Sequence, residues 1–198
     1  MTDLLAALQP LLISTATVAL AEIGDKTQLL ALLLAARFRK PLPILLGILL
    51  ATILNHSVAA WVGAWLAGAL PAWLLRWSVV VSFLLVAIWS LLPDKLDESE
   101  AKPSRFGPFM TTLVVFFLVE IGDKTQIATV LLAARFHPLW PVIAGTTLGM
   151  MLADGPAVLL GARFAPRLPM TAARWIAAGV FAALGIWVAI YGLGNPLS

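Results

Sequence analysis

Six long stretches of apolar residues follow one another along the chain, and shorter polar connections separate them. A helix needs roughly 20 apolar residues to cross a bilayer, and each stretch is long enough. The sequence therefore predicts an all-α membrane protein with six transmembrane helices. Their predicted ranges are 8–36, 41–67, 72–92, 107–135, 138–162 and 171–192.

The composition agrees with this pattern. Hydrophobic residues make up 61% of the 198 residues, charged residues 12%, and the mean hydropathy is +0.98. A typical soluble domain has about 25% charged residues, so an ordinary soluble protein is excluded. The net charge of +3 does not indicate nucleic acid, because the basic residues sit at helix ends rather than in one patch. We expect membrane lipid as the partner, and the sequence indicates no oligomeric state.

The basic residues also predict an orientation. Only Arg76 and Arg135 lie near the side opposite to the other basic residues at helix ends. Cytoplasmic connections carry the excess of Lys and Arg, so we expect connections 1–2, 3–4 and 5–6 inside and both termini outside. The nine residues in these connections are Arg37, Arg39, Lys40, Lys95, Lys102, Arg105, Arg163, Arg167 and Arg174.

The chain is a duplication. The heptad EIGDKTQ occurs at Glu22–Gln28 and again at Glu120–Gln126, and further identities continue at the same offset of 98 residues. The predicted units are two three-helix halves, 1–92 and 106–198, joined by a polar linker at 93–105. Because three is odd, the second half must enter the membrane in the opposite sense. Sites in such inverted repeats lie near the midplane at the repeat interface, so we expect the two heptads to face each other there.

The heptads place four carboxylates within apolar sequence. Each costs roughly 2.5–3.5 kcal/mol at the centre of a spanning helix, which indicates a functional site. On a continuous helix, a Glu and an Asp three residues apart share one face. We expect the intervening glycines to loosen that helix. The acids are Glu22, Asp25, Glu120 and Asp123, and the glycines are Gly24 and Gly122.

Other heptad residues are predicted to support the site. Lys26 and Lys124 lie four residues after each Glu, where an ion pair within the helix balances charge. Four carboxylates and two ammoniums leave a charge of about −2, which a divalent cation neutralises. Oxygen ligands favour hard cations such as Ca²⁺, Mg²⁺ and Mn²⁺. Carboxylates that share a low-dielectric site also take up protons, so metal and proton compete. The further oxygen donors are Thr27, Thr125, Gln28 and Gln126.

The second helix of each half carries polar residues at matched places. The first half has Asn55 and His56, and the second has Asp154 followed by Gly155 and Pro156. We expect Asp154 to act as a ligand or proton carrier, and Asn55 as a ligand or an interhelical hydrogen-bonding group. For His56, packing is favoured over a proton role. Pro156 is predicted to break or kink its helix.

The paired Glu-x-Gly-Asp-Lys-Thr motifs, each on the first helix of a half, resemble those of the GDT family of cation/proton exchangers. The resemblance implies a secondary transporter in a bacterial inner membrane that exports Mn²⁺, or else Ca²⁺, in exchange for protons. The cation is cargo, and no cofactor is expected. It implies cation binding by Glu22, Asp25, Glu120 and Asp123, with Gln28, Gln126, Thr27 and Thr125 adjoining and Asn55 and Asp154 at polar positions.

Four alternatives stay open at this point. An exporter of amino acids or other organic cations would use a similar six-helix fold but needs apolar walls around its solute. A membrane-embedded enzyme could use acids and lysine for proton transfer, although no Ser/Cys–His arrangement supports it. A channel would need a continuous polar pore. Finally, the Glu–Lys pairs could be buried salt bridges that only hold helices together.

Overall fold

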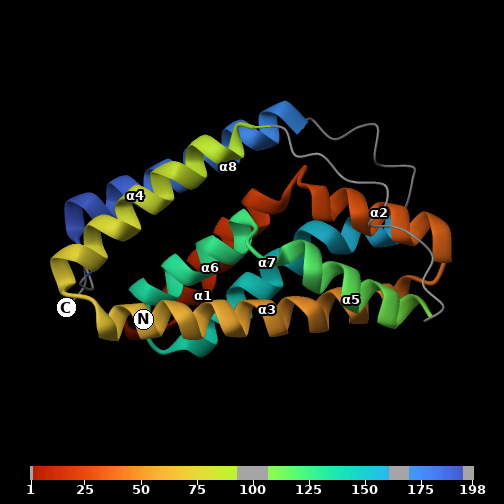
Figure 1. Ribbon diagram of the computed structural model, residues 1–198, viewed down its shortest axis with the longest axis horizontal. Coiled ribbons are helices and arrows are strands. Elements are labelled where there is room, and N and C mark those ends of the chain that lie inside the picture. The colour runs from red at the N-terminus through yellow and green to blue at the C-terminus, as the bar shows by residue number, and fades with distance from the viewer. Residues whose placement is uncertain (1, 93–106, 161–169, 194–198) are drawn as a thin grey trace.

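The computed structural model describes residues 2–92, 107–160 and 170–193, and all regular elements in these ranges are α-helices (Figure 1). The predicted linker 93–105 and the predicted cytoplasmic residues Arg163 and Arg167 lie outside them. In chain order the helices are α1 (Thr2–Glu22), α2 (Lys26–Phe38), α3 (Pro41–Ala69), α4 (Ala72–Ser90), α5 (Pro108–Glu120), α6 (Lys124–Arg135), α7 (Leu139–Leu160) and α8 (Met170–Tyr191).

Two of the six predicted spans are divided. The ranges 8–36 and 107–135 were predicted as continuous helices, and this is wrong, because α1 gives way to α2 and α5 to α6 inside each heptad. Four helices of the described ranges are long and apolar enough to cross a membrane: α3, α4, α7 and the Arg174–Tyr191 part of α8. The segments Leu8–Glu22 and Pro108–Glu120 are shorter apolar helices.

The two halves pack across each other. In the first half α1 and α2 lie on α7, and in the second half α5 and α6 lie on α3. Both crossings need a glycine: a Cβ at Gly47 would lie 2.9 Å from the carbonyl oxygen of Phe109, and one at Gly145 would lie 2.5 Å from that of Leu11. All four positions obey the offset of 98 residues. The contacts therefore repeat with the sequence, as a two-fold arrangement requires.

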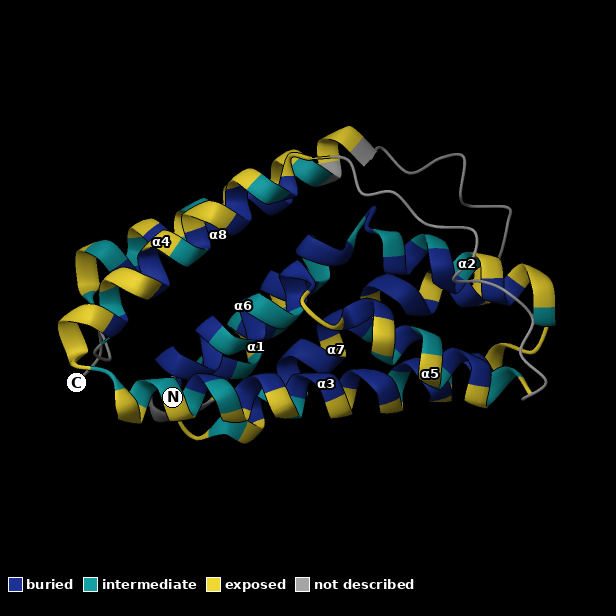
Figure 2. Ribbon diagram, in the orientation of Figure 1, coloured by how far each residue is buried: buried dark blue, intermediate teal, exposed yellow. Residues whose placement is uncertain are grey.

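The last helix of each half, α4 in the first and α8 in the second, pairs with the other. Helices α4 and α8 lie side by side and run in opposite directions (Figure 1). Phe83 and Phe181, again 98 residues apart, stack in the contact with ring centroids 6.3 Å apart. The outer faces of both helices are largely exposed (Figure 2) and carry large apolar side chains such as Trp73 and Ile190. Such faces are typical of helices that contact lipid.

Helix α7 differs from expectation at one residue. Pro156 is predicted to break or kink this helix; α7 continues through it to Leu160, so there is no break, and the kink stays a prediction. Proline removes the hydrogen bond to the carbonyl four residues earlier, here that of Leu152. Helix α7 packs against α1, α2 and α3, and this packing stabilises it in spite of the lost hydrogen bond.

Candidate cation site

Each heptad is a helix break built around a glycine. Gly24 and Gly122 both have φ of +78°, a left-handed conformation that other residues rarely adopt. The first helix of each half ends at the Glu of the heptad and the next begins at the Lys. Glu22 and Asp25 therefore do not share one face of a continuous helix, and that prediction is wrong.

The aspartate of each heptad begins the following helix. Asp25 and Asp123 have extended backbones at the N-cap positions of α2 and α6. In the first half, Oδ1 of Asp25 accepts a hydrogen bond of 2.8 Å from the amide of Lys26. Asp123 makes no such side-chain cap. Asp25 therefore caps its own helix, whereas the carboxylate of Asp123 is left to interact with other residues.

The glutamines close the breaks. Oε1 of Gln28 accepts from the amide of Gly24 at 2.9 Å, and Oε1 of Gln126 accepts from that of Gly122 at 2.6 Å. Nε2 of Gln28 also donates to the carbonyl oxygen of Ala153 on α7 at 2.9 Å. Both glutamines therefore stabilise the irregular backbone beside the carboxylates.

Three carboxylates from both halves converge. Glu22, Glu120 and Asp123 each offer an oxygen within 4.8 Å of the others, and their exposed fractions are 0%, 0% and 1%. Thr125 donates to Oε2 of Glu120 at 3.0 Å, whereas neither oxygen of Glu22 has a hydrogen-bond partner. Buried carboxylates are costly without a partner. Asp25, predicted to be a fourth member, lies outside this group.

The lysines connect the two halves. Nζ of Lys26 lies 3.3 Å from Oδ1 of Asp123, and Nζ of Lys124 lies 3.0 Å from Oδ1 of Asp25. The predicted ion pairs between each Glu and the Lys four residues later are therefore wrong, because the helix break carries the lysines away from the glutamates. The prediction that the heptads face each other is confirmed by the two crossed pairs.

Asp154 is a further acid at this site. It is fully buried, both of its oxygens lack hydrogen-bond partners, and it interacts electrostatically with Glu22 and Glu120. Ninety-eight residues earlier in the repeat stands His56, which is also buried, with neither ring nitrogen hydrogen-bonded. At matched positions, α7 therefore carries a buried acid and α3 a buried histidine.

Asn55 and Thr27, both predicted as possible ligands, have different environments. Nδ2 of Asn55 donates to the carbonyl oxygen of Phe117 at 3.0 Å, in the last turn of α5, so it joins two helices. Thr27 is fully buried and its hydroxyl has no hydrogen-bond partner. The carbonyl of Ala153 was not predicted as part of the site, and nothing in its sequence context marks it.

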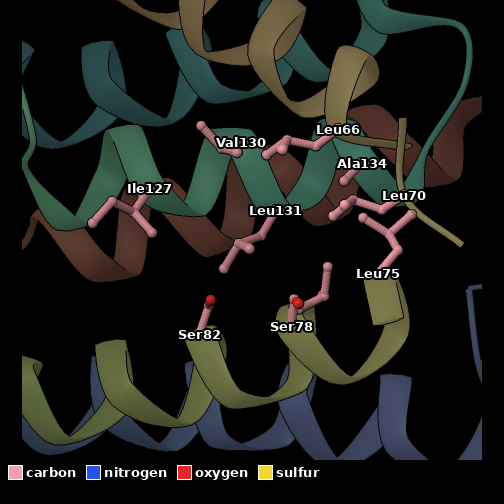
Figure 3. Close-up of a pocket in the computed structure, with 10 residues that line it drawn as sticks. Leu66, Leu70, Leu75, Ser78, Ser82, Ile127, Val130, Leu131 and Ala134 are labelled. Atoms are coloured by element: carbon pink, nitrogen blue, oxygen red, sulfur yellow. The ribbon is translucent and has the colours of Figure 1, made fainter. Parts of the chain in front are cut away.

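An apolar cavity lies apart from these acids. It has a volume of about 200 Å³ and lies between α3, α4 and α6 (Figure 3). Ser78 and Ser82 supply its only side-chain hydroxyls. Because its lining holds no carboxylate, this cavity does not have the ligands of a cation site.

Buried carboxylates beside paired helix breaks, contributed by two inverted repeats, are characteristic of one class of protein, the secondary transporters of membranes. The family profile described as divalent cation/proton antiporter GDT1 matches residues 10–98 and 108–196, one match for each half. The chain belongs to this family and is an integral membrane protein.

Two relatives support the assignment. The chain is 52% identical over 182 residues to a protein of Vibrio cholerae serotype O1 named as a candidate manganese exporter, covering 91% of this chain and 90% of the relative. It is 27% identical over 172 residues to a GDT1-like protein of Synechocystis sp., covering 76% and 82%. No solved structure matches the chain.

Proposed function

We propose that this protein exports a divalent cation from the cytoplasm, Mn²⁺ in preference to Ca²⁺, in exchange for protons. In this proposal the chain crosses a bacterial inner membrane six times, with α1–α2 and α5–α6 each crossing as an interrupted helix and both termini outside. Glu22, Glu120 and Asp123 bind the cation, and Asp25 and Asp154 complete the acidic surroundings.

The observation that carries the proposal is the convergence of Glu22, Glu120 and Asp123 within 4.8 Å. That spacing suits one ion bound by several carboxylate oxygens. It leaves no room between the acids for an organic solute with apolar walls, which disfavours an exporter of amino acids. The name of the Vibrio cholerae relative favours manganese as the cargo.

Proton exchange follows from the same carboxylates. Five acids lie in or beside the site, and two lysines of the described residues form ion pairs with two of them. When the cation leaves, the charge repulsion and the burial of these acids favour proton uptake. Since both occupants use the same oxygens, each excludes the other, and the site alternates between a metal-bound and a protonated form.

The proposal is tested in inside-out vesicles that hold an acid-inside gradient, with luminal pH followed by a quenched dye. Adding Mn²⁺ should relieve the quenching, and Ca²⁺ should do so less strongly. Glu120→Gln should abolish the response, while Ser82→Ala in the apolar cavity should keep it. An inserted, folded protein that gives no response to either ion would contradict proton exchange.

A further inference from the structure

The two heptad lysines occupy different surroundings although their heptads are identical. The side chain of Lys26 is 24% exposed, whereas that of Lys124 is 3% exposed. A lysine is a strongly hydrated charge on a flexible stem, so a half-buried ammonium can move into water far more easily than a buried one. Lys26 is therefore the less enclosed of the two positive charges.

Their partners differ in the same way. Asp25, the partner of Lys124, also caps α2 and lies outside the group of converging acids. Asp123, the partner of Lys26, belongs to that group and makes no side-chain cap. Lys26 thus pairs with a carboxylate of the proposed cation site, whereas Lys124 pairs with a carboxylate outside it.

We propose that the ammonium of Lys26 is an internal substitute for the transported cation, and that it makes the site selective for divalent charge. This inference rests on the proposed function. In the cation-free protein Lys26 binds Asp123, and an arriving cation displaces it toward water. Lys124 keeps its place on Asp25 and holds the two halves together.

Selectivity follows from the exchange of charge. At equal distance a divalent ion attracts Asp123 about twice as strongly as an ammonium does. A sodium or potassium ion brings only the same single charge as the ammonium that it would have to remove. Displacement therefore favours Mn²⁺ or Ca²⁺ and opposes the monovalent ions, which are far more abundant around the protein.

The test measures Mn²⁺ binding to the purified full-length protein and to Lys26→Gln and Lys124→Gln, with and without competing KCl. Lys26→Gln should bind Mn²⁺ about tenfold more tightly, because the competing charge is gone, and KCl should now compete. Lys124→Gln removes the same charge from Asp25, outside the converging acids, so it should tighten Mn²⁺ binding much less and should not let KCl compete. Equal tightening in both variants, or none in Lys26→Gln, would overturn the proposal.

A second readout needs no variant. The rate at which an amine-acylating reagent modifies Lys26 in the native protein is measured by mass spectrometry, with and without Mn²⁺. Mn²⁺ should raise the rate at Lys26 and leave Lys124 unchanged, and protection of Lys26 would contradict displacement. If the native protein binds no Mn²⁺ at all, the proposed function itself fails. Tight Mn²⁺ binding with unchanged Lys26 labelling refutes only the role of Lys26.

Discussion

The two copies of EIGDKTQ have one sequence and two environments. Glu120 accepts a hydrogen bond from Thr125, while the matching Glu22 has no hydrogen-bond partner and Thr27 is equally without one. Local sequence cannot produce this difference, so it must come from the helices around each break.

The pair α4–α8 packs unequally on the two halves. Helix α8 packs on α1, and α4 packs on α6, while among the described helices α2 and α5 make no comparable contact with this pair. A symmetric molecule would make both sets of contacts. One-sided packing of this kind is what alternating access by rocking of repeats predicts for a single end state. The repeated sequence would therefore allow a second packing, in which the pair contacts α2 and α5 instead, if the protein transports by rocking one repeat against the other.

The largest expected effect comes from removing either glutamate. Glu22→Gln and Glu120→Gln should each weaken Mn²⁺ binding by about 100-fold or more, because affinity depends on the number of charged ligands. If the heptads form one site, the two variants should be equally impaired despite their different hydrogen bonding. Isothermal titration with Mn²⁺ measures this, and strong binding in either variant would contradict a shared site.

The two helix breaks have the same left-handed glycine, so replacing either glycine should lower the free energy of unfolding by a similar amount. A Cβ at Gly122 meets no atom within 4 Å, so Gly122→Ala tests the left-handed conformation alone. It should lower the free energy of unfolding by about 1–2 kcal/mol. Gly179→Ala in α8 is the control, also without close neighbours, and should be neutral or stabilising. Thermal unfolding in detergent provides the comparison, and an equally stable Gly122→Ala protein would refute the need for glycine.

The arginines at the ends of α2 and α6 should differ sharply. Arg135 is 8% exposed, donates to the carbonyl of Leu193 and stacks over the ring of Trp187 at 4.8 Å. Its repeat counterpart Arg37 is exposed. Arg135→Ala should destabilise the protein by about 2 kcal/mol by removing both contacts, and Arg37→Ala by much less. If both variants lost the same stability in thermal unfolding, the different contacts of the two arginines would not matter for stability.

The smallest effect concerns the threonines. Thr125→Val removes the hydrogen bond to Glu120, and Thr27→Val removes a hydroxyl that has no partner. The first should weaken Mn²⁺ binding by about tenfold, since a hydrogen bond to a charged group contributes about 1.5 kcal/mol. The second should change it little. Identical losses would mean that both threonines contact the cation directly.

The sequence predicted the repeat, the convergence of the heptads and three of the acids that meet there, but it also placed Asp25 among them, which lies outside the group. It did not predict the breaks, because the apolar residues on both sides of each motif are compatible with one continuous helix. A signal was present, since Gly24 followed by Asp25 is a helix-ending glycine before a helix-capping aspartate. The crossed pairing of the lysines was beyond prediction, because it depends on how closely α2 and α6 approach.

The central claim is that acids from both repeats form one cation site. The most direct test counts Mn²⁺ ions bound per chain by electron paramagnetic resonance, in the native protein and in Glu22→Gln and Glu120→Gln. We expect one ion per chain in the native protein and none in either variant at the same Mn²⁺ concentration. Two ions per chain, with one retained in each variant, would show two separate sites and contradict the account.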